Sequence, residues 1–190
     1  MKMERILPFA KNLLEKAIKP GDFVVDATVG NGHDTVFLAG LVGENGMVYG
    51  FDIQEEAIAA TRERLTQNGL LEQVTIFHAG HEQLSAKIPT NVHGKLTGAI
   101  FNLGYLPGSD KTTVTRPETT IAAIEQLLDM MAPEGTIVLV IYHGHEQGVV
   151  ERDSLLQYCE QIHQRTAHVL QYQFINQQNN PPFIVAIEKR

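Results

Sequence analysis

The sequence predicts one α/β domain, residues 1–190, built on an open and doubly wound sheet. Three observations support this fold class. Short apolar segments that favour strands alternate five times with segments of helical periodicity. Glycine or proline marks many of the boundaries between them. The last two apolar segments have no helix between them, so we expect a C-terminal antiparallel hairpin that brings the sheet to seven strands, one of them reversed.

Residues 1–20 are expected to form an N-terminal amphipathic helix that packs on this domain. Apolar side chains recur there at helical spacing with charged side chains between them, and Pro20-Gly21 ends the segment. The apolar positions are Ile6, Ala10, Leu13, Leu14, Ala17 and Ile18. We interpret this helix as a cover for one face of the sheet rather than a membrane-surface helix.

The strands and helices of the five units follow in order. The strands are expected over residues 23–25, 47–53, 74–77, 97–103 and 136–142. Their helices are expected over 33–42, 54–68, 82–87, 115–131 and 149–164, and the hairpin over 168–175 and 183–188. Thr115, Pro117 and Glu118 have the form of a capping box. Arg62 and Arg64 are expected on the outer face of their helix. The fifth strand is apolar along its whole length, which predicts burial on both faces.

Composition and charge narrow the class of protein. Hydrophobic residues make up 43% of the chain and charged residues 19%, which is typical of an ordinary globular protein. The net charge of −7 argues against nucleic-acid binding through bulk charge, although it leaves room for a local patch. The single Cys159 excludes an internal disulfide, and its place in a predicted helix argues against a catalytic thiol. We find no secretory or membrane-spanning segment and expect a cytoplasmic protein without a membrane partner.

Polar residues cluster at the carboxyl ends of the predicted strands, the edge at which ligands bind in doubly wound sheets. The stretches are 26–32, 52, 80–82, 102–111 and 142–146. This coincidence predicts an enzyme. His143 and His145 share one face of a strand end, but spacing places no third ligand beside them, so no metal is expected. No G-x-S-x-G occurs, which argues against a serine hydrolase.

A glycine-bearing turn follows the first strand and leads into a helix. Gly30 and Gly32 let the backbone take positive φ and let a ligand approach the free N–H groups of the helix N-terminus. The dinucleotide fingerprint G-x-G-x-x-G nevertheless fails, because Thr35 or Thr28 occupies a glycine position in either register. The turn is therefore not predicted to hold a nicotinamide dinucleotide.

Two acids indicate a different ligand. Asp26, inside the turn, would repel a pyrophosphate but could hold an ammonium group. Asp52, at the end of the second strand, could accept both hydroxyls of a ribose, or it could cap the next helix. A ribose joined to a cationic amino-acid end describes S-adenosylmethionine.

The chain resembles the class I S-adenosylmethionine-dependent methyltransferases over essentially its full length. The glycine loop of that family, D/E-x-G-x-G-x-G, is present as residues 26–32 with Thr28 in place of the first glycine. The family's ribose acid matches Asp52, and its third motif matches residues 80–82. The resemblance implies a Rossmann-like methyltransferase sheet, S-adenosylmethionine as cofactor and S-adenosylhomocysteine as product. The cofactor-binding residues that it implies are Asp26, Thr28, Gly30, Asn31, Gly32, His33, Asp34, Thr35, Asp52, Ile53, His81, Glu82 and Asn102.

Two strings, DATVGNGHDT (26–35) and NLGYLPGSDK (102–111), are similar to those of a narrower group. These are the bacterial rRNA-methylase-like proteins, which include the tRNA 5-aminomethyl-(2-thio)uridine-34 methyltransferase. In amino-methylating members of the wider class the fourth motif is an Asn/Asp-Pro-Pro-Tyr turn, and residues 102–107 stand in its place. The resemblance implies N-methylation of the 5-aminomethyl group of wobble uridine 34. The partner that it implies is the tRNA anticodon stem-loop, and it is compatible with a homodimer.

The fourth motif and its surroundings carry the catalytic roles that this resemblance implies. Asn102 would accept a hydrogen bond from the target amine, and Tyr105 would stack on the uracil ring. Asp110 or His143 would take up the proton of the amine. The duller alternative for Tyr105 is a residue that shapes a turn.

Lys111 and Arg116 would contact RNA phosphates on the same resemblance. A solvated loop is the alternative, because Asp110 and Glu118 lie beside them in the sequence. Three alternatives stay open for the whole protein: a methyltransferase of rRNA, a methyltransferase of a small-molecule amine, and a cofactor-binding scaffold with no catalysis of its own.

Overall fold

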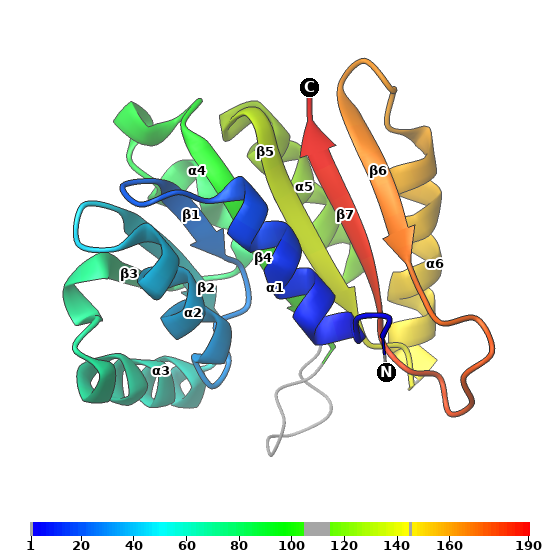
Figure 1. Cartoon of the computed structure of the whole chain (residues 1–190), viewed down its shortest axis with the longest axis horizontal. Helices are drawn as coiled ribbons and strands as arrows, with labels where there is room; N and C mark the ends of the chain where they lie inside the picture. The colour runs from blue at the N-terminus through cyan, green and yellow to red at the C-terminus, as the bar shows by residue number, and fades with distance from the viewer. Residues whose placement is uncertain (1, 105–114, 145) are drawn as a thin grey trace.

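Seven strands form one sheet in the computed structural model of this chain, which describes residues 2–104, 115–144 and 146–190 (Figure 1). The order is β3-β2-β1-β4-β5-β7-β6. The strands are β1 (Phe23–Asp26), β2 (Met47–Asp52), β3 (Val74–His78), β4 (Leu96–Leu103), β5 (Met131–Ile141), β6 (Ala167–Tyr172) and β7 (Phe183–Lys189). β1 to β5 run parallel, β7 is antiparallel to β5, and β6 is antiparallel to β7. The predicted fold class, with its C-terminal hairpin, is confirmed.

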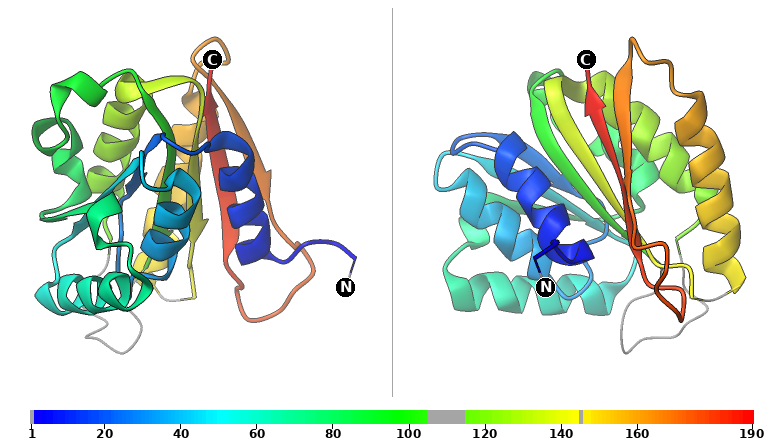
Figure 2. Two further views of the ribbon diagram at one scale, coloured as in Figure 1. Left: turned by 60° about the vertical axis from the view of Figure 1, so that its left-hand side comes forward. Right: turned by 45° about the vertical axis from the view of Figure 1, so that its right-hand side comes forward.

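Helices cover both faces of the sheet (Figure 2). One face packs on α1 (Ile6–Ala17) and α2 (His33–Val42), and the other on α4 (Leu84–Lys87), α5 (Pro117–Met130) and α6 (Glu146–Gln161). α3 (Glu55–Asn68) contacts α2, β2 and β3. Short 3-10 turns lie at Leu71–Gln73, His81–Gln83 and Thr90–Val92. Within the described residues, no helix combines the length and the apolar character that crossing a bilayer requires.

The central strands are apolar because both of their faces are buried. On β5, Ile137 and Leu139 lie in the core under α5 and α6, while Val138 and Val140 lie in the core under α1 and α2. Successive side chains of a strand point to opposite faces, so a strand covered on both sides needs an apolar residue at every position. The continuous apolar run of the fifth predicted strand is explained in this way.

The N-terminal helix is held by the sheet and by the hairpin. α1 crosses β4, β5 and β7, and its buried residues are Ile6, Ala10 and Leu14. The Phe9 ring stacks on Tyr172 with 4.0 Å between centroids. The Tyr172 hydroxyl donates a hydrogen bond to the carbonyl oxygen of Glu4 at 2.9 Å. These contacts fix α1 beside the edge of the sheet at which the parallel strands end.

Two local predictions are wrong, and both for tertiary reasons. Thr115 does not cap α5, which has no side-chain N-cap; its hydroxyl donates to Glu151 Oε2 at 2.6 Å and accepts the backbone N–H of Gly104 at 3.0 Å. Arg64 is half-buried rather than outward, because its Nε donates to the carbonyl oxygen of Asn31 at 2.7 Å. Side chains that sequence patterns assign to a helix surface are used here to fix loops.

Candidate active site

A cavity of about 1130 Å³ lies at the carboxyl ends of the parallel strands. The connections after β1 and β4 leave the sheet there toward opposite faces, which opens a crevice between them. Residues from five strand ends line the cavity: 27–31, 33, 34, 51–54, 79–82, 102–104 and 142–144. α1, the start of α5 and the loop before β7 add Leu7, Ala10, Lys11, Thr115, Arg116, Thr119 and Asn180. Described residues from each of the five predicted strand-end stretches line this cavity, although Asp26 and Gly32 do not.

The glycine loop has the backbone that its sequence predicts. Gly30 and Gly32 are left-handed, with φ of 50° and 78°. A Cβ on Gly32 would lie 2.9 Å from Thr61 Oγ1 of α3, so only glycine fits under that helix. The Thr61 hydroxyl also donates to the carbonyl oxygen of Gly30 at 3.0 Å. α2 begins directly afterwards at His33, which places its free N–H groups beside the cavity.

Asp26 lies behind this loop rather than on the wall of the cavity. Its carboxylate is completely buried and accepts hydrogen bonds from the Thr35 hydroxyl at 2.6 Å and from the Thr28 N–H at 3.2 Å. Burial, and then the charge of Asp34, raises the pKa of Asp26 to about 7. Asp26, Gly32 and Thr35 are absent from the cavity lining. Asp26 is expected from the sequence to hold an ammonium group directly, but its carboxylate is turned away from the cavity, whereas Asp34, eight residues further along the chain, lines it.

Asp52 joins the second strand to the glycine loop. Its Oδ2 accepts the N–H of Gly30 at 3.0 Å and its Oδ1 accepts the N–H of Gln54 at 2.9 Å. The N-cap position of α3 is Gln54, with no side-chain cap, so Asp52 does not act as the cap of that helix. Ile53 beside it is 57% exposed and lines the cavity. An acid and an apolar side chain in this order suit the ribose and the base of a nucleoside.

His81 follows β3 and presents a defined tautomer. Its Nδ1 lies 3.1 Å from the carbonyl oxygen of Ala27, so Nδ1 carries the proton and Nε2 carries a lone pair. Nε2 is buried and has no partner among the described residues. Burial lowers the pKa of His81, which keeps the ring neutral. Glu82 also lines the cavity, and its carbonyl oxygen accepts Gln126 Nε2 at 2.7 Å.

Asn102, on β4, is held from two sides by the segment that follows β1. Its backbone N–H donates to Thr28 Oγ1 at 2.7 Å. Its side-chain Nδ2 donates to Asp34 Oδ2, also at 2.7 Å. Because the amide nitrogen is engaged by the carboxylate, Oδ1 is the atom left to accept a hydrogen bond.

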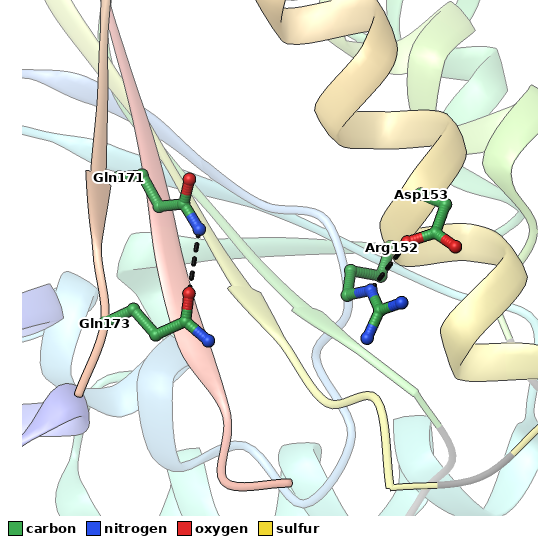
Figure 3. A network of polar contacts seen from close by, with 4 residues as sticks. All are labelled: Arg152, Asp153, Gln171 and Gln173. Carbon is green, nitrogen blue, oxygen red and sulfur yellow. Dashed lines mark hydrogen bonds and ion pairs between the residues drawn. The ribbon is translucent and has the colours of Figure 1, made fainter. Parts of the chain in front are cut away.

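His143 follows β5 and is a candidate proton acceptor. It is 5% exposed, lines the cavity, and neither ring nitrogen has a partner within the described part of the chain. Burial, and then the positive charge of Arg152, lowers the pKa of His143. Arg152 itself is paired with Asp153 at 2.7 Å (Figure 3). His143 is therefore expected to be neutral near pH 7.

The remaining predicted residues have different outcomes. Tyr105, Asp110 and Lys111 lie outside the described residues, as does the second histidine of the 143/145 pair. Arg116 is exposed and lines the cavity at the start of α5. Within the described ranges, no group of three His, Cys, Asp or Glu side chains could hold a metal ion.

Sequence patterns missed several residues of the wall. Tyr142 is not one of them, because it lies in the predicted strand-end stretch 142–146; it is 37% exposed and lines the cavity. Thr115 and the buried Glu151 fix the position of Gly104, but nothing in their spacing indicates it. Lys11 of α1 and Asn180 of the hairpin loop are far from any motif, so only the packing of those segments brings them to the cavity.

Known proteins share this fold and parts of this sequence. The model of the "Putative rRNA methylase" family matches residues 48–188. A crystal structure described as a "putative rRNA-methylase", from Clostridium thermocellum, is 42% identical, has a TM-score of 0.96, and the match covers 100% of both chains. A "putative methyltransferase" from Streptococcus mutans, in complex with S-adenosylhomocysteine, is 35% identical with a TM-score of 0.89 over 99% of both chains.

Similarity also extends to a curated protein. The chloroplastic tRNA (mnm(5)s(2)U34)-methyltransferase of Arabidopsis thaliana is 38% identical over 142 residues, which cover 70% of this chain and 51% of that protein. The chain thus spans about half the length of that relative.

These matches, together with the sheet and the strand-end cavity, show that the protein is of the class of S-adenosylmethionine-dependent methyltransferases. The residues present suit that cofactor, because Gly30 and the N-terminus of α2 lie at the cavity and Asp52 lines it, where a carboxylate could accept the hydroxyls of a ribose. Within this class, the chain belongs to the putative rRNA methylase family, whose model matches most of its length.

Proposed function

We propose that the protein transfers a methyl group from S-adenosylmethionine to the nitrogen of the 5-aminomethyl group on uridine, or 2-thiouridine, 34 of tRNA. The observation that carries the proposal is the orientation of the Asn102 amide: its nitrogen donates to Asp34, so its Oδ1 is left as a hydrogen-bond acceptor at the cavity. The 38% identity with a tRNA methyltransferase of that specificity supports the same acceptor. We also propose the cytoplasm, one of the compartments that hold tRNA, as its location.

The cofactor supplies a methyl group already activated by its sulfonium sulfur, so the residues of the protein mainly have to align the acceptor nitrogen with it. Asn102 Oδ1 accepts a hydrogen bond from an N–H of the amine. This contact directs the nitrogen lone pair away from Asn102 and toward the methyl group. The amide of Asn102 cannot rotate freely, because Asp34 holds its nitrogen at 2.7 Å.

Proton transfer decides the reactivity of an alkyl amine. Such an amine has a pKa of about 10, as lysine does, so only its minor neutral form can attack at neutral pH. The ammonium form must therefore lose one proton before it attacks; the N–CH₃ bond then forms as the S–CH₃ bond breaks, and the product is a secondary ammonium group with S-adenosylhomocysteine. His143 can accept this proton, because it is neutral and both ring nitrogens lack partners among the described residues.

The cavity has cationic groups on its outer walls that suit a polyanionic substrate. Lys11 from α1 and Arg116 from α5 line it, and these helices cover opposite faces of the sheet. Tyr142 adds a partly exposed ring that could stack on a base. We assign Arg116 to the phosphates of the anticodon loop, with Lys11 as a second contact.

Labelled S-adenosylmethionine tests the proposal against its rivals. The acceptors are bulk tRNA from a strain that lacks the gene, rRNA from the same strain, and a panel of small amines. Label in tRNA supports the proposal. Label in rRNA alone or in amines alone contradicts it, and cofactor binding without transfer to any acceptor indicates a scaffold.

Variants of Asn102 make the same assay specific for the site. Asn102→Ala should lower the turnover number at least about a hundredfold, because it removes an oriented acceptor at the reacting atom. Asn91→Ala, at an exposed position in the Thr90–Val92 turn, is the matched control and should leave the turnover number unchanged. Equal turnover of Asn102→Ala and wild type would refute the role of this residue.

A further inference from the structure

Two residues of the segment that follows β1 hold Asn102 by both its backbone and its side chain. We propose that Thr28 and Asp34 are positioning residues, which set Asn102 so that its Oδ1 faces the acceptor nitrogen. This inference rests on the function proposed above, because it assigns a task to Asn102. The inference adds that the glycine loop and Asn102 act as one rigid unit.

The backbone contact arises where the ladder between β1 and β4 stops. Ala27 N–H donates to the carbonyl oxygen of Ile100 at 2.9 Å, and a regular parallel ladder would next join the N–H of Asn102 to the carbonyl oxygen of Ala27. That oxygen instead accepts from His81 Nδ1 at 3.1 Å. The Thr28 hydroxyl oxygen takes its place and accepts the N–H of Asn102 at 2.7 Å.

This contact gives a reason for the departure from the family's glycine loop. Thr28 stands where the pattern D/E-x-G-x-G-x-G has its first glycine. A glycine has no side-chain oxygen, so it would leave the half-buried N–H of Asn102 without this acceptor. Thr28 belongs to the glycine loop and also lines the cavity, so the same side chain connects that loop with Asn102.

The side-chain contact fixes the orientation of the Asn102 amide. Asp34 lies in the first turn of α2, where the helix N-terminus stabilises a carboxylate. An ionised carboxylate only accepts hydrogen bonds, so the Asn102 amide must present Nδ2 to it, and a flipped amide would set two acceptor oxygens against each other. The charged acceptor makes this a strong hydrogen bond, at 2.7 Å. Oδ1 is thereby turned away from Asp34.

Paired variants at the two positions test the proposal by kinetics. Thr28→Val keeps the shape and removes the acceptor, and Asp34→Ala removes the carboxylate. Each should lower the turnover number about tenfold, the effect of one lost hydrogen bond in the transition state, while the dissociation constant for S-adenosylmethionine changes less than about threefold. Thr28→Ser and Asp34→Asn retain an oxygen acceptor and should recover to within about threefold of wild type.

A control and a direct readout separate positioning from a general loss of structure. Thr75→Val, on β3, removes a hydroxyl whose one hydrogen bond to the described residues goes to Met47 Sδ at 3.6 Å, and should leave the turnover number unchanged. Hydrogen exchange of the Asn102 backbone amide, followed by NMR, should speed up about tenfold in Thr28→Val and not in Thr28→Ser. The Asn102 side-chain NH₂ resonances, assigned with Asn102→Asp, should shift in Asp34→Ala.

The outcomes distinguish this inference from the proposed function. If wild type methylates no tRNA, the function fails, while amide exchange still decides whether Thr28 and Asp34 hold Asn102. Unchanged exchange and resonances in the variants overturn the positioning roles even if tRNA is methylated. A loss of turnover that is matched by an equal loss of cofactor affinity also overturns them, because it indicates cofactor binding instead.

Discussion

Asp26 provides a test of the electrostatics at the centre of the site through the substitution Asp26→Asn. The Asp26 carboxyl is completely buried, and its two hydrogen-bond donors, the Thr35 hydroxyl and the Thr28 N–H, are both uncharged. Burial, and then the charge of Asp34, raises its pKa from 3.8 to about 7. The folded state therefore binds more protons than the unfolded state between these two values, and the free energy of unfolding falls as the pH rises through that window.

The size of the effect follows from the shift. Between pH 5 and pH 8 the wild-type protein should lose roughly 2 to 3 kcal/mol of stability through Asp26 alone. Asparagine is neutral at every pH and keeps one oxygen for the Thr35 hydroxyl. The stability of Asp26→Asn relative to wild type should thus rise by about that amount between pH 5 and pH 8.

Urea unfolding at the two pH values, followed by circular dichroism, measures the difference if the variants share one m-value. Asp129→Asn is the matched control, since it removes the same charge at an exposed position on α5. If the stability of Asp26→Asn relative to wild type is the same at pH 5 and pH 8, Asp26 does not titrate in this window and the reasoning is wrong.

Three further substitutions probe the glycine loop, the buried carboxyl of Glu151 and the proton acceptor. Gly32→Ala should cost at least about 2 kcal/mol of stability, because its φ is positive and the new Cβ would meet Thr61. Gly69→Ala is the control: its φ is also positive, but the space around it is open, so it should cost only about 1 kcal/mol. Equal losses of the two variants in urea unfolding would contradict the steric argument. Glu151→Leu leaves the hydroxyls of Thr115 and Thr120 without their acceptor and should cost roughly 2 to 3 kcal/mol of stability, whereas Glu151→Gln should cost less. Thermal unfolding ranks the two variants, and the reverse order would be inconsistent with these hydrogen bonds. His143→Phe should lower the turnover number about a hundredfold and remove the acid limb of the pH profile that lies below the ordinary pKa of histidine; an unchanged profile would exclude His143 as the proton acceptor.

Much of the fold could be predicted because local and tertiary requirements agree. β5 needs apolar residues on both faces, and its sequence shows that directly. The hairpin could be inferred because no helix separates its two strands. Polar strand ends such as Asp52 and Asn102 could be placed together because parallel strands finish at one edge.

The remaining features depend on contacts that a sequence pattern does not encode. Thr115 matches a capping box, yet its hydroxyl is used by Glu151, a residue 36 positions away. Arg64 matches a solvated helix face, yet it binds the glycine loop. Asp26 has the right charge for an ammonium group, but the path of the loop places it behind the wall. In each case a polar side chain forms a hydrogen bond with a backbone group or another side chain, and only the folded chain brings the two groups together.

The central claim is the identity of the methyl acceptor. The most direct measurement is mass spectrometry of nucleosides from tRNA of a strain lacking the gene, after incubation with the purified protein and S-adenosylmethionine. We predict that the 5-aminomethyl nucleoside of position 34 disappears and that its N-methylated form takes its place, and that Asn102→Ala makes this change at least about a hundredfold more slowly. Methylation of any other nucleoside, or no change in tRNA alongside transfer to rRNA or a small amine, would contradict it.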